Sequence, residues 1–73
     1  MARQRNRIAE ARQHTGWTQA ELAERVGLER SSIAHIERGS NPTLANAQRL
    51  ALALGAPLDW LFPPDTMNPT QAD

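Results

Sequence analysis

The sequence predicts an all-α protein, a compact bundle of five helices. Apolar residues recur at helical spacing in successive segments, and no segment alternates apolar and polar residues as a strand would. Glycines 16, 27, 39 and 55 each follow one of these segments, where a left-handed residue commonly ends a helix. The 73 residues match the length of one small domain.

The first three helices are predicted over about residues 5–15, 18–26 and 30–38. Arg12 is expected on the inner face of the first. The second opens with TQAE, in which Thr18 and Glu21 match a capping box. The predicted inward apolar residues of these helices are Ile8, Ala11, Leu22, Ala23, Val26, Ile33 and Ile36.

The fourth helix is predicted from the end of NPT to Gly55, and Pro57 suits the first turn of a short fifth helix. The inward stripe of the fourth helix is Leu44, Ala47, Leu50, Ala51 and Leu54. We expect one domain over residues 1–62. Residues 63–73 have three prolines and no apolar period, which predicts a flexible tail.

Only the sequence GLE (27–29) separates the second and third helices. A connection this short makes two helices cross steeply. Ala23 is small enough for the close approach, and Gly27 can adopt the positive φ of the turn. Ile33 and Ile36 then fill the space beneath the crossing, so residues 18–38 predict a helix-turn-helix.

The sequence TQAELAERVGLERSSIAHIERG resembles the helix-turn-helix of the Cro/C1-type (XRE-like) DNA-binding regulators of bacteria and phages. The match covers about residues 5–62 and includes the entry GWTQ (16–19) and the segment LALALG (50–55). It implies a lambda-repressor-like fold with the third helix in the major groove. Two features depart from the family pattern: Glu29 replaces the usual capping residue, and the loop GSNPT has no basic residue.

The third helix has a face opposite Ile33 and Ile36 that can contact DNA. Its amino-terminal part meets base edges in this motif. There an Arg side chain can hydrogen-bond to guanine and a Ser side chain to several bases, while Ala can contact a thymine methyl and His can donate to a purine N7. A solvated polar face is the alternative. The predicted base-reading residues are Arg30, Ser31, Ala34 and His35.

Phosphate contacts are expected around this face, because the start of the second helix has free N–H groups that favour an anion. The resemblance implies that Gln19 binds a backbone phosphate and orients the first side chain of the third helix. Arg38 can instead be solvated, and the loop residues can simply shape the turn. The predicted phosphate contacts are Thr18, Gln19, Arg38, Ser40 and Asn41.

The resemblance makes Arg12 and Glu37 a structural bridge between the first and third helices, costly to break on one side only. Trp60 and Phe62 either cap the core or form a dimer or partner face. Trp17 is expected to pack rather than to stack on bases.

The formal net charge is zero, but the charges are unevenly distributed. Residues 1–38 hold seven Arg and five Glu, whereas residues 39–73 hold one Arg and three Asp. Arginine suits forked contacts to phosphates and bases. The predicted amino-terminal arm either follows the DNA backbone or is disordered, and it consists of Arg3, Arg5 and Arg7.

Composition argues against an enzyme. The chain has no cysteine, and His14 and His35 lack a third metal ligand. No nucleophile triad, phosphate loop or carboxylate pair stands out, so neither a cofactor nor a metal is expected. No apolar run approaches the roughly 20 residues that span a bilayer, and a cytoplasmic protein without membrane contact is the expectation.

We therefore expect sequence-specific binding of double-stranded DNA by a transcriptional regulator, either a repressor or an autoregulator. A homodimer would place two recognition helices about 34–36 Å apart on an inverted repeat. The alternative is a protein-interaction module on the same fold, antitoxin-like or partner-binding, which uses PLDWLF to bind a protein partner and binds DNA only secondarily.

Overall fold

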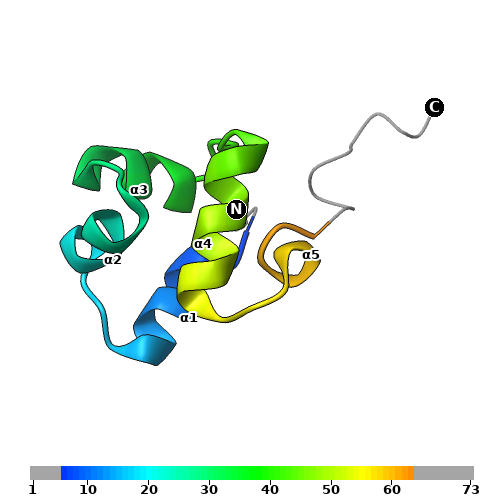
Figure 1. Cartoon of the computed structure of the whole chain (residues 1–73), viewed down its shortest axis with the longest axis horizontal. Helices are drawn as coiled ribbons and strands as arrows, with labels where there is room; N and C mark the ends of the chain where they lie inside the picture. The colour runs from blue at the N-terminus through cyan, green and yellow to red at the C-terminus, as the bar shows by residue number, and fades with distance from the viewer. Residues whose placement is uncertain (1–5, 64–73) are drawn as a thin grey trace.

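The computed structural model describes residues 6–63, and this part of the chain consists of five α-helices joined by loops (Figure 1). Their bounds are α1 Ile8–Thr15, α2 Gln19–Val26, α3 Arg30–Glu37, α4 Leu44–Leu54 and α5 Leu58–Leu61. The central helix α4 packs against α1, α2 and α5, and α3 packs against α1 and α2. The predicted all-α fold with five helices is confirmed. No helix in residues 6–63 is long and apolar enough to cross a membrane.

The start of α2 is fixed by its own side chains. The Thr18 hydroxyl oxygen accepts the Glu21 backbone N–H at 3.0 Å, and a Glu21 carboxylate oxygen accepts the Thr18 N–H at 2.8 Å. This is the predicted capping box, and such a cap stabilises a helix by about 1 kcal/mol. In contrast, Glu29 precedes α3 without a side-chain cap bond, as its poor capping ability suggested.

The turn between α2 and α3 has the predicted length and contains a left-handed residue. Gly27 has φ +75°, a conformation that costs glycine little because it lacks a Cβ atom. The next residue, Leu28, donates its N–H to the Ala23 carbonyl at 2.9 Å. This bond gives one of the last free carbonyl oxygens of α2 a donor, so α2 stops sharply and the chain can enter α3.

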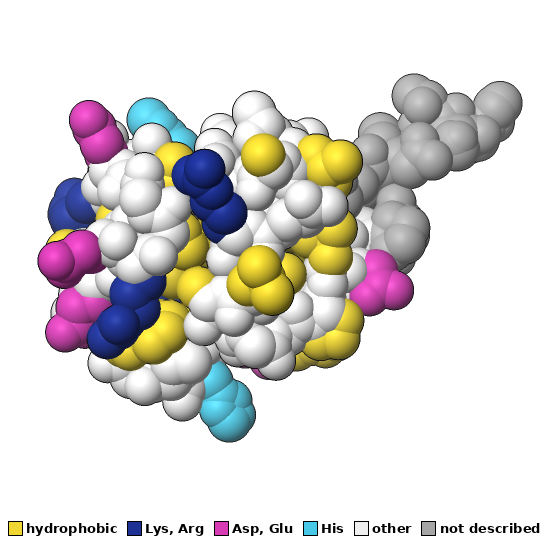
Figure 2. All heavy atoms as spheres, in the orientation of Figure 1, with side chains coloured by type: hydrophobic (Ala, Val, Ile, Leu, Met, Phe, Trp, Pro, Cys, Tyr) yellow, Lys and Arg dark blue, Asp and Glu magenta, His cyan; other side chains and the backbone are white. Residues whose placement is uncertain are grey.

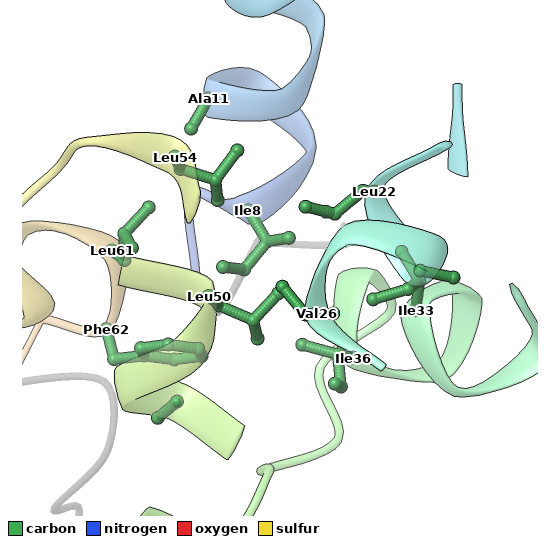
Figure 3. Packing of buried hydrophobic residues seen from close by; sticks show 12 residues of the cluster. Ile8, Ala11, Leu22, Val26, Ile33, Ile36, Leu50, Leu54, Leu61 and Phe62 are labelled. Atoms are coloured by element: carbon green, nitrogen blue, oxygen red, sulfur yellow. The ribbon is translucent and has the colours of Figure 1, made fainter. Parts of the chain in front are cut away.

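All five helices contribute to one apolar core (Figure 3). Leu50 of α4 is fully buried, and Figure 3 shows it among Ile8, Val26 and Phe62, which come from three other parts of the chain. Ala23 is 3% exposed, consistent with its role as a small residue at a close helix contact. The buried apolar residues are Ile8, Ala11, Leu22, Ala23, Val26, Ile33, Ile36, Ala47, Leu50, Leu54, Leu61 and Phe62.

The prediction for Leu44 was wrong. Although it has the register of the inward stripe, its side chain is 65% exposed. Leu44 is the first residue of α4, and Figure 1 shows this end of α4 at the edge of the molecule. Apolar periodicity gives the face of a helix but not how far along its axis the neighbouring helices extend.

The first helix begins at Ile8 rather than near residue 5 because Asn6 shapes its entry. Asn6 is 5% exposed; its side-chain oxygen accepts the Ile8 N–H at 3.0 Å, and its amide nitrogen donates to the Ile36 carbonyl at 2.8 Å. Asn6 therefore accepts the first backbone N–H of α1 from the position before the Arg7 N-cap, and it also binds the carboxyl-terminal end of α3. This role of Asn6 was not predicted from the sequence, although Asn before an apolar helical pattern is a known start signal.

Arg7 is not part of a free basic arm, which corrects that prediction. Its backbone N–H donates to the Leu61 carbonyl at 2.8 Å, and its guanidinium donates to the Trp60 carbonyl at 2.7 Å. The guanidinium also lies over the Trp60 ring, 4.9 Å from the centroid. Arg7 therefore joins the start of α1 to α5. Arg3, Arg5 and residues 64–73, most of the predicted tail, lie outside the described residues.

The two aromatic residues near α5 have different environments. Phe62 is 5% exposed and belongs to the core, whereas Trp60 is 38% exposed. Of the two alternatives stated for these residues, Phe62 therefore belongs to the core, and a dimer or partner face stays a prediction for Trp60 alone. Pro57 lies just before α5 rather than in its first turn.

An ion pair joins α1 to α3. The Arg12 Nε and a Glu37 carboxylate oxygen lie 2.6 Å apart, and their side chains are only 13% and 9% exposed. A second Arg12 nitrogen donates to the other Glu37 oxygen at 3.4 Å, and a third donates to the Trp17 carbonyl at 2.7 Å. The bridge predicted from the resemblance is present, and it also holds the loop between α1 and α2.

Replacing Leu50 by Ala should lower the free energy of unfolding by about 2–5 kcal/mol, because Leu50 is 0% exposed and the substitution leaves a cavity in the core. Urea denaturation followed by circular dichroism would measure this change. Leu52→Ala on the same helix is the matched control, since Leu52 is 84% exposed, and we expect a change within about 0.5 kcal/mol. Equal effects of the two variants would contradict the described core.

Glu37→Gln should lower the free energy of unfolding by about 1–3 kcal/mol, because it weakens charged hydrogen bonds and leaves the Arg12 guanidinium without its counter-charge. Thermal unfolding would show this as a lower Tm. Glu24→Gln on the exposed side of α2 is the control, with little expected change. An unchanged Tm for Glu37→Gln would rule out a stabilising role for the bridge.

Candidate nucleic-acid interface

One side of α3 is buried and the other faces solvent. Ile33 and Ile36 are 0% and 5% exposed, and they hold the helix against the core. The residues predicted to read bases lie on the remaining surface, where Arg30, Ser31 and His35 are exposed and Ala34 is half-buried. Positions three and four apart are neighbours on a helix surface, so Ser31, Ala34 and His35 form a continuous strip of short or planar side chains beside Arg30.

The amino-terminal end of α2 presents free hydrogen-bond donors. The capping box uses the N–H groups of Thr18 and Glu21, while those of Gln19 and Ala20 have no acceptor within the helix. The Thr18 oxygen accepts a bond, which leaves the hydroxyl proton free to donate. These donors and the positive end of the helix dipole favour an anion such as a phosphate.

Gln19 is held by a hydrogen bond that sequence analysis missed. Its amide nitrogen donates to a Glu37 carboxylate oxygen at 2.9 Å, which leaves one N–H and the carbonyl oxygen for another partner. The resemblance implied that Gln19 orients Arg30, the first side chain of α3. In the structure, the Gln19 bond goes to Glu37 at the opposite end of that helix.

The loop after α3 brings polar groups to the surface. Arg38 is the exposed carboxyl-terminal cap of α3. The backbone N–H of Ser40 donates to the His35 carbonyl at 3.0 Å, so Ser40 helps to end the helix. The Ser40 hydroxyl and the Asn41 amide belong to exposed residues and can donate hydrogen bonds outward.

Charges of both signs lie near these helices. Glu21, Glu24 and Glu29 are exposed, and Figure 2 shows acidic and basic side chains together at the end of the molecule that contains α2 and α3. A uniformly basic face would attract any polyanion. Because acidic and basic side chains are mixed here, binding of an anion would depend on hydrogen-bond donors at particular positions rather than on overall charge.

Trp17 packs at the side of α2 as expected. It is half-buried against the core, and the Arg25 guanidinium lies over its ring, 4.3 Å from the centroid. This contact occupies a face of the indole and was not predicted.

The histidines and acidic residues of the described part of the chain do not converge on a metal site. Residues 6–63 contain no cluster of three or more His, Cys, Asp or Glu side chains placed to hold a metal ion. His14 lies in the last turn of α1 and His35 belongs to α3, and Figure 2 shows the two histidine side chains at opposite edges of the molecule.

Comparison with known proteins agrees with this geometry. A helix-turn-helix family model matches residues 8–61. A helix-turn-helix transcriptional regulator from Archaeoglobus fulgidus is 42% identical over 59 residues, which cover 80% of this chain and 84% of the relative.

Two solved structures resemble the fold. The restriction-modification controller protein C.AhdI from Aeromonas hydrophila superposes with a TM-score of 0.71 and 40% identity, covering 77% of this chain and 86% of its own. SinR, the master regulator for biofilm formation of Bacillus subtilis, was solved in complex with DNA; it has a TM-score of 0.67 and 30% identity, covering 71% and 86%. On the family match, the identities and the fold, this chain belongs to the Cro/C1-type (XRE-like) helix-turn-helix family of DNA-binding transcriptional regulators.

Proposed function

We propose that this protein binds a specific double-stranded DNA sequence as a homodimer and acts as a repressor or autoregulator of transcription. The observation that carries the proposal is the exposed strip of α3 beside the donor-rich start of α2. The first can enter a major groove, and the second can bind the adjacent phosphate backbone. The DNA complex of SinR supports the same use of a similar fold.

Base recognition is assigned to the strip on α3. The Arg30 guanidinium can donate two parallel hydrogen bonds to guanine O6 and N7. Ser31 can pair with several bases, the Ala34 methyl can contact a thymine methyl, and His35 can donate to a purine N7. Apart from Arg30, these side chains are short or planar, so the helix can lie deep in the groove.

Phosphate binding is assigned to both sides of this strip. Thr18 and Gln19 would bind one phosphate at the start of α2, with the backbone N–H groups described above. Arg38, Ser40 and Asn41 would bind the other side, where Arg38 adds a positive charge. Such contacts fix the orientation of the helix on the duplex without selecting a base.

A homodimer is proposed because one recognition helix contacts few base pairs. Two copies related by a two-fold axis would read an inverted repeat with half-sites about one turn, roughly 34–36 Å, apart. Trp60 is the residue we assign to the dimer or partner face, since it is the aromatic side chain near α5 that remains exposed.

Selection from a pool of randomised DNA duplexes with the purified full chain tests this function directly. We expect enrichment of an inverted repeat, because two symmetric α3 helices impose that symmetry on their site. Enrichment of a single half-site would contradict the dimer. Absence of any enrichment would contradict sequence-specific binding and favour the protein-interaction alternative.

Arg30→Ala should weaken binding to the selected site by about 1–3 kcal/mol and relax the preference at one base position in each half-site. Affinities for the site and for single-base variants, measured by fluorescence anisotropy, would show both effects. Gln19→Ala is the contrasting variant, because losing a phosphate contact should weaken binding to specific and random DNA alike. If Arg30→Ala loses affinity without changing any base preference, direct recognition by Arg30 is wrong.

A further inference from the structure

One partly buried carboxylate, that of Glu37, accepts hydrogen bonds both from a residue assigned to a phosphate contact and from an arginine of another helix. Glu37 accepts the Gln19 amide N–H at 2.9 Å and the Arg12 Nε–H at 2.6 Å. Gln19 begins α2, Glu37 ends α3, and Arg12 lies within α1. The hydrogen bonds therefore connect the proposed phosphate site at the start of α2 to α1, for which no DNA contact is proposed.

This arrangement places a negative charge directly behind a donor that is assigned to bind a negative phosphate. An ionised carboxylate that is 9% exposed is poorly screened by water, so its repulsion of a nearby phosphate would be appreciable. The Arg12 guanidinium counters that charge at the shortest distance in the network, with bonds to both carboxylate oxygens. Among the described side chains, Arg12 is the cation that the structure pairs with Glu37.

We propose that Arg12 is a determinant of DNA affinity that acts through Glu37, by neutralising the carboxylate that holds Gln19 at the phosphate site. Arg12 is thus a positioning and charge-compensating residue rather than a DNA contact. The inference rests on the proposed DNA binding and on the phosphate contact assigned to Gln19. It assigns the bridge a role in binding in addition to its role in stability.

The test measures affinity of the full chain for its selected duplex at low salt, well below the Tm of each variant. Arg12→Gln should weaken binding roughly three- to tenfold, because the Glu37 charge is then uncompensated. The double variant Arg12→Gln with Glu37→Gln should regain most of this loss, although its Tm stays below that of the unmodified protein. If the bridge had only a structural role, the double variant should recover no affinity, because removing both partners does not restore the packing between α1 and α3.

A matched control separates this local effect from net charge. Arg12→Gln with Glu10→Gln restores the same net charge through an exposed residue of α1, and it should regain little affinity. Equal recovery by Glu10→Gln and Glu37→Gln would overturn the proposal, and so would full affinity of Arg12→Gln. If the unmodified chain binds no duplex, the proposed function itself fails, which is a distinguishable outcome.

Two further variants keep the test informative if Arg12→Gln does not fold. Arg12→Lys retains the charge without the forked geometry, so it should lower the Tm while keeping affinity near that of the unmodified protein. Glu37→Gln alone should lower the Tm, and it should weaken DNA binding less than Arg12→Gln does, because it leaves no uncompensated negative charge near the phosphate. A loss of affinity in either variant as large as that expected for Arg12→Gln would overturn the proposal.

Discussion

The bridge between Arg12 and Glu37 is the interaction on which the arrangement of the first three helices depends. Three guanidinium N–H groups are used, two on Glu37 and one on the Trp17 carbonyl. Glu37 then accepts a further bond from Gln19. Helices α1, α2 and α3 are thereby joined by directional bonds at low exposure, where hydrogen bonds to charged groups are stronger than at the surface.

Directional bonds matter here because the helices are short. Helices α1, α2 and α3 have eight residues each, and a helix of that length is not stable alone in water. The apolar core supplies most of the stabilisation, but apolar contacts are non-directional. The bridge and the Asn6 bond to the Ile36 carbonyl therefore fix the end of α3, while Ile33 and Ile36 anchor its inner side.

The inner and outer sides of α3 have different roles, because the core and the bridge hold the helix from within. Its inner residues are held by the core and its last residue by the bridge, which frees the outer strip to be short and polar. A solvent-exposed strip of this kind contributes little to folding. Its composition can therefore match a duplex rather than a neighbouring helix.

The capping box, the glycine turn and the inward stripes of the first three helices were predictable because they depend on neighbours in sequence. Thr18 and Glu21 are three positions apart, and the turn at Gly27 is set by bonds over a few residues. The exposed strip of α3 followed from the same register, because the side opposite a buried stripe faces solvent.

Other features depend on partners far apart in sequence and could not be predicted in this way. Leu44 has the right register but no covering helix, and Phe62 is core while Trp60 is exposed. Arg7 meets Trp60 and Asn6 meets Ile36, in each case across at least 30 positions. No local pattern encodes these pairings.

The sequence by itself determined the five helices, the short turn and the side of α3 that is exposed, because helical periodicity and turn chemistry act over a few residues. Its resemblance to a known family also indicated the bridge. Only the tertiary structure decided that Gln19 shares the carboxylate of Glu37, and that Arg7 belongs to the fold instead of a free arm. Such contacts join residues that are far apart in sequence, and they form only because packing of the helices brings those residues close together in space.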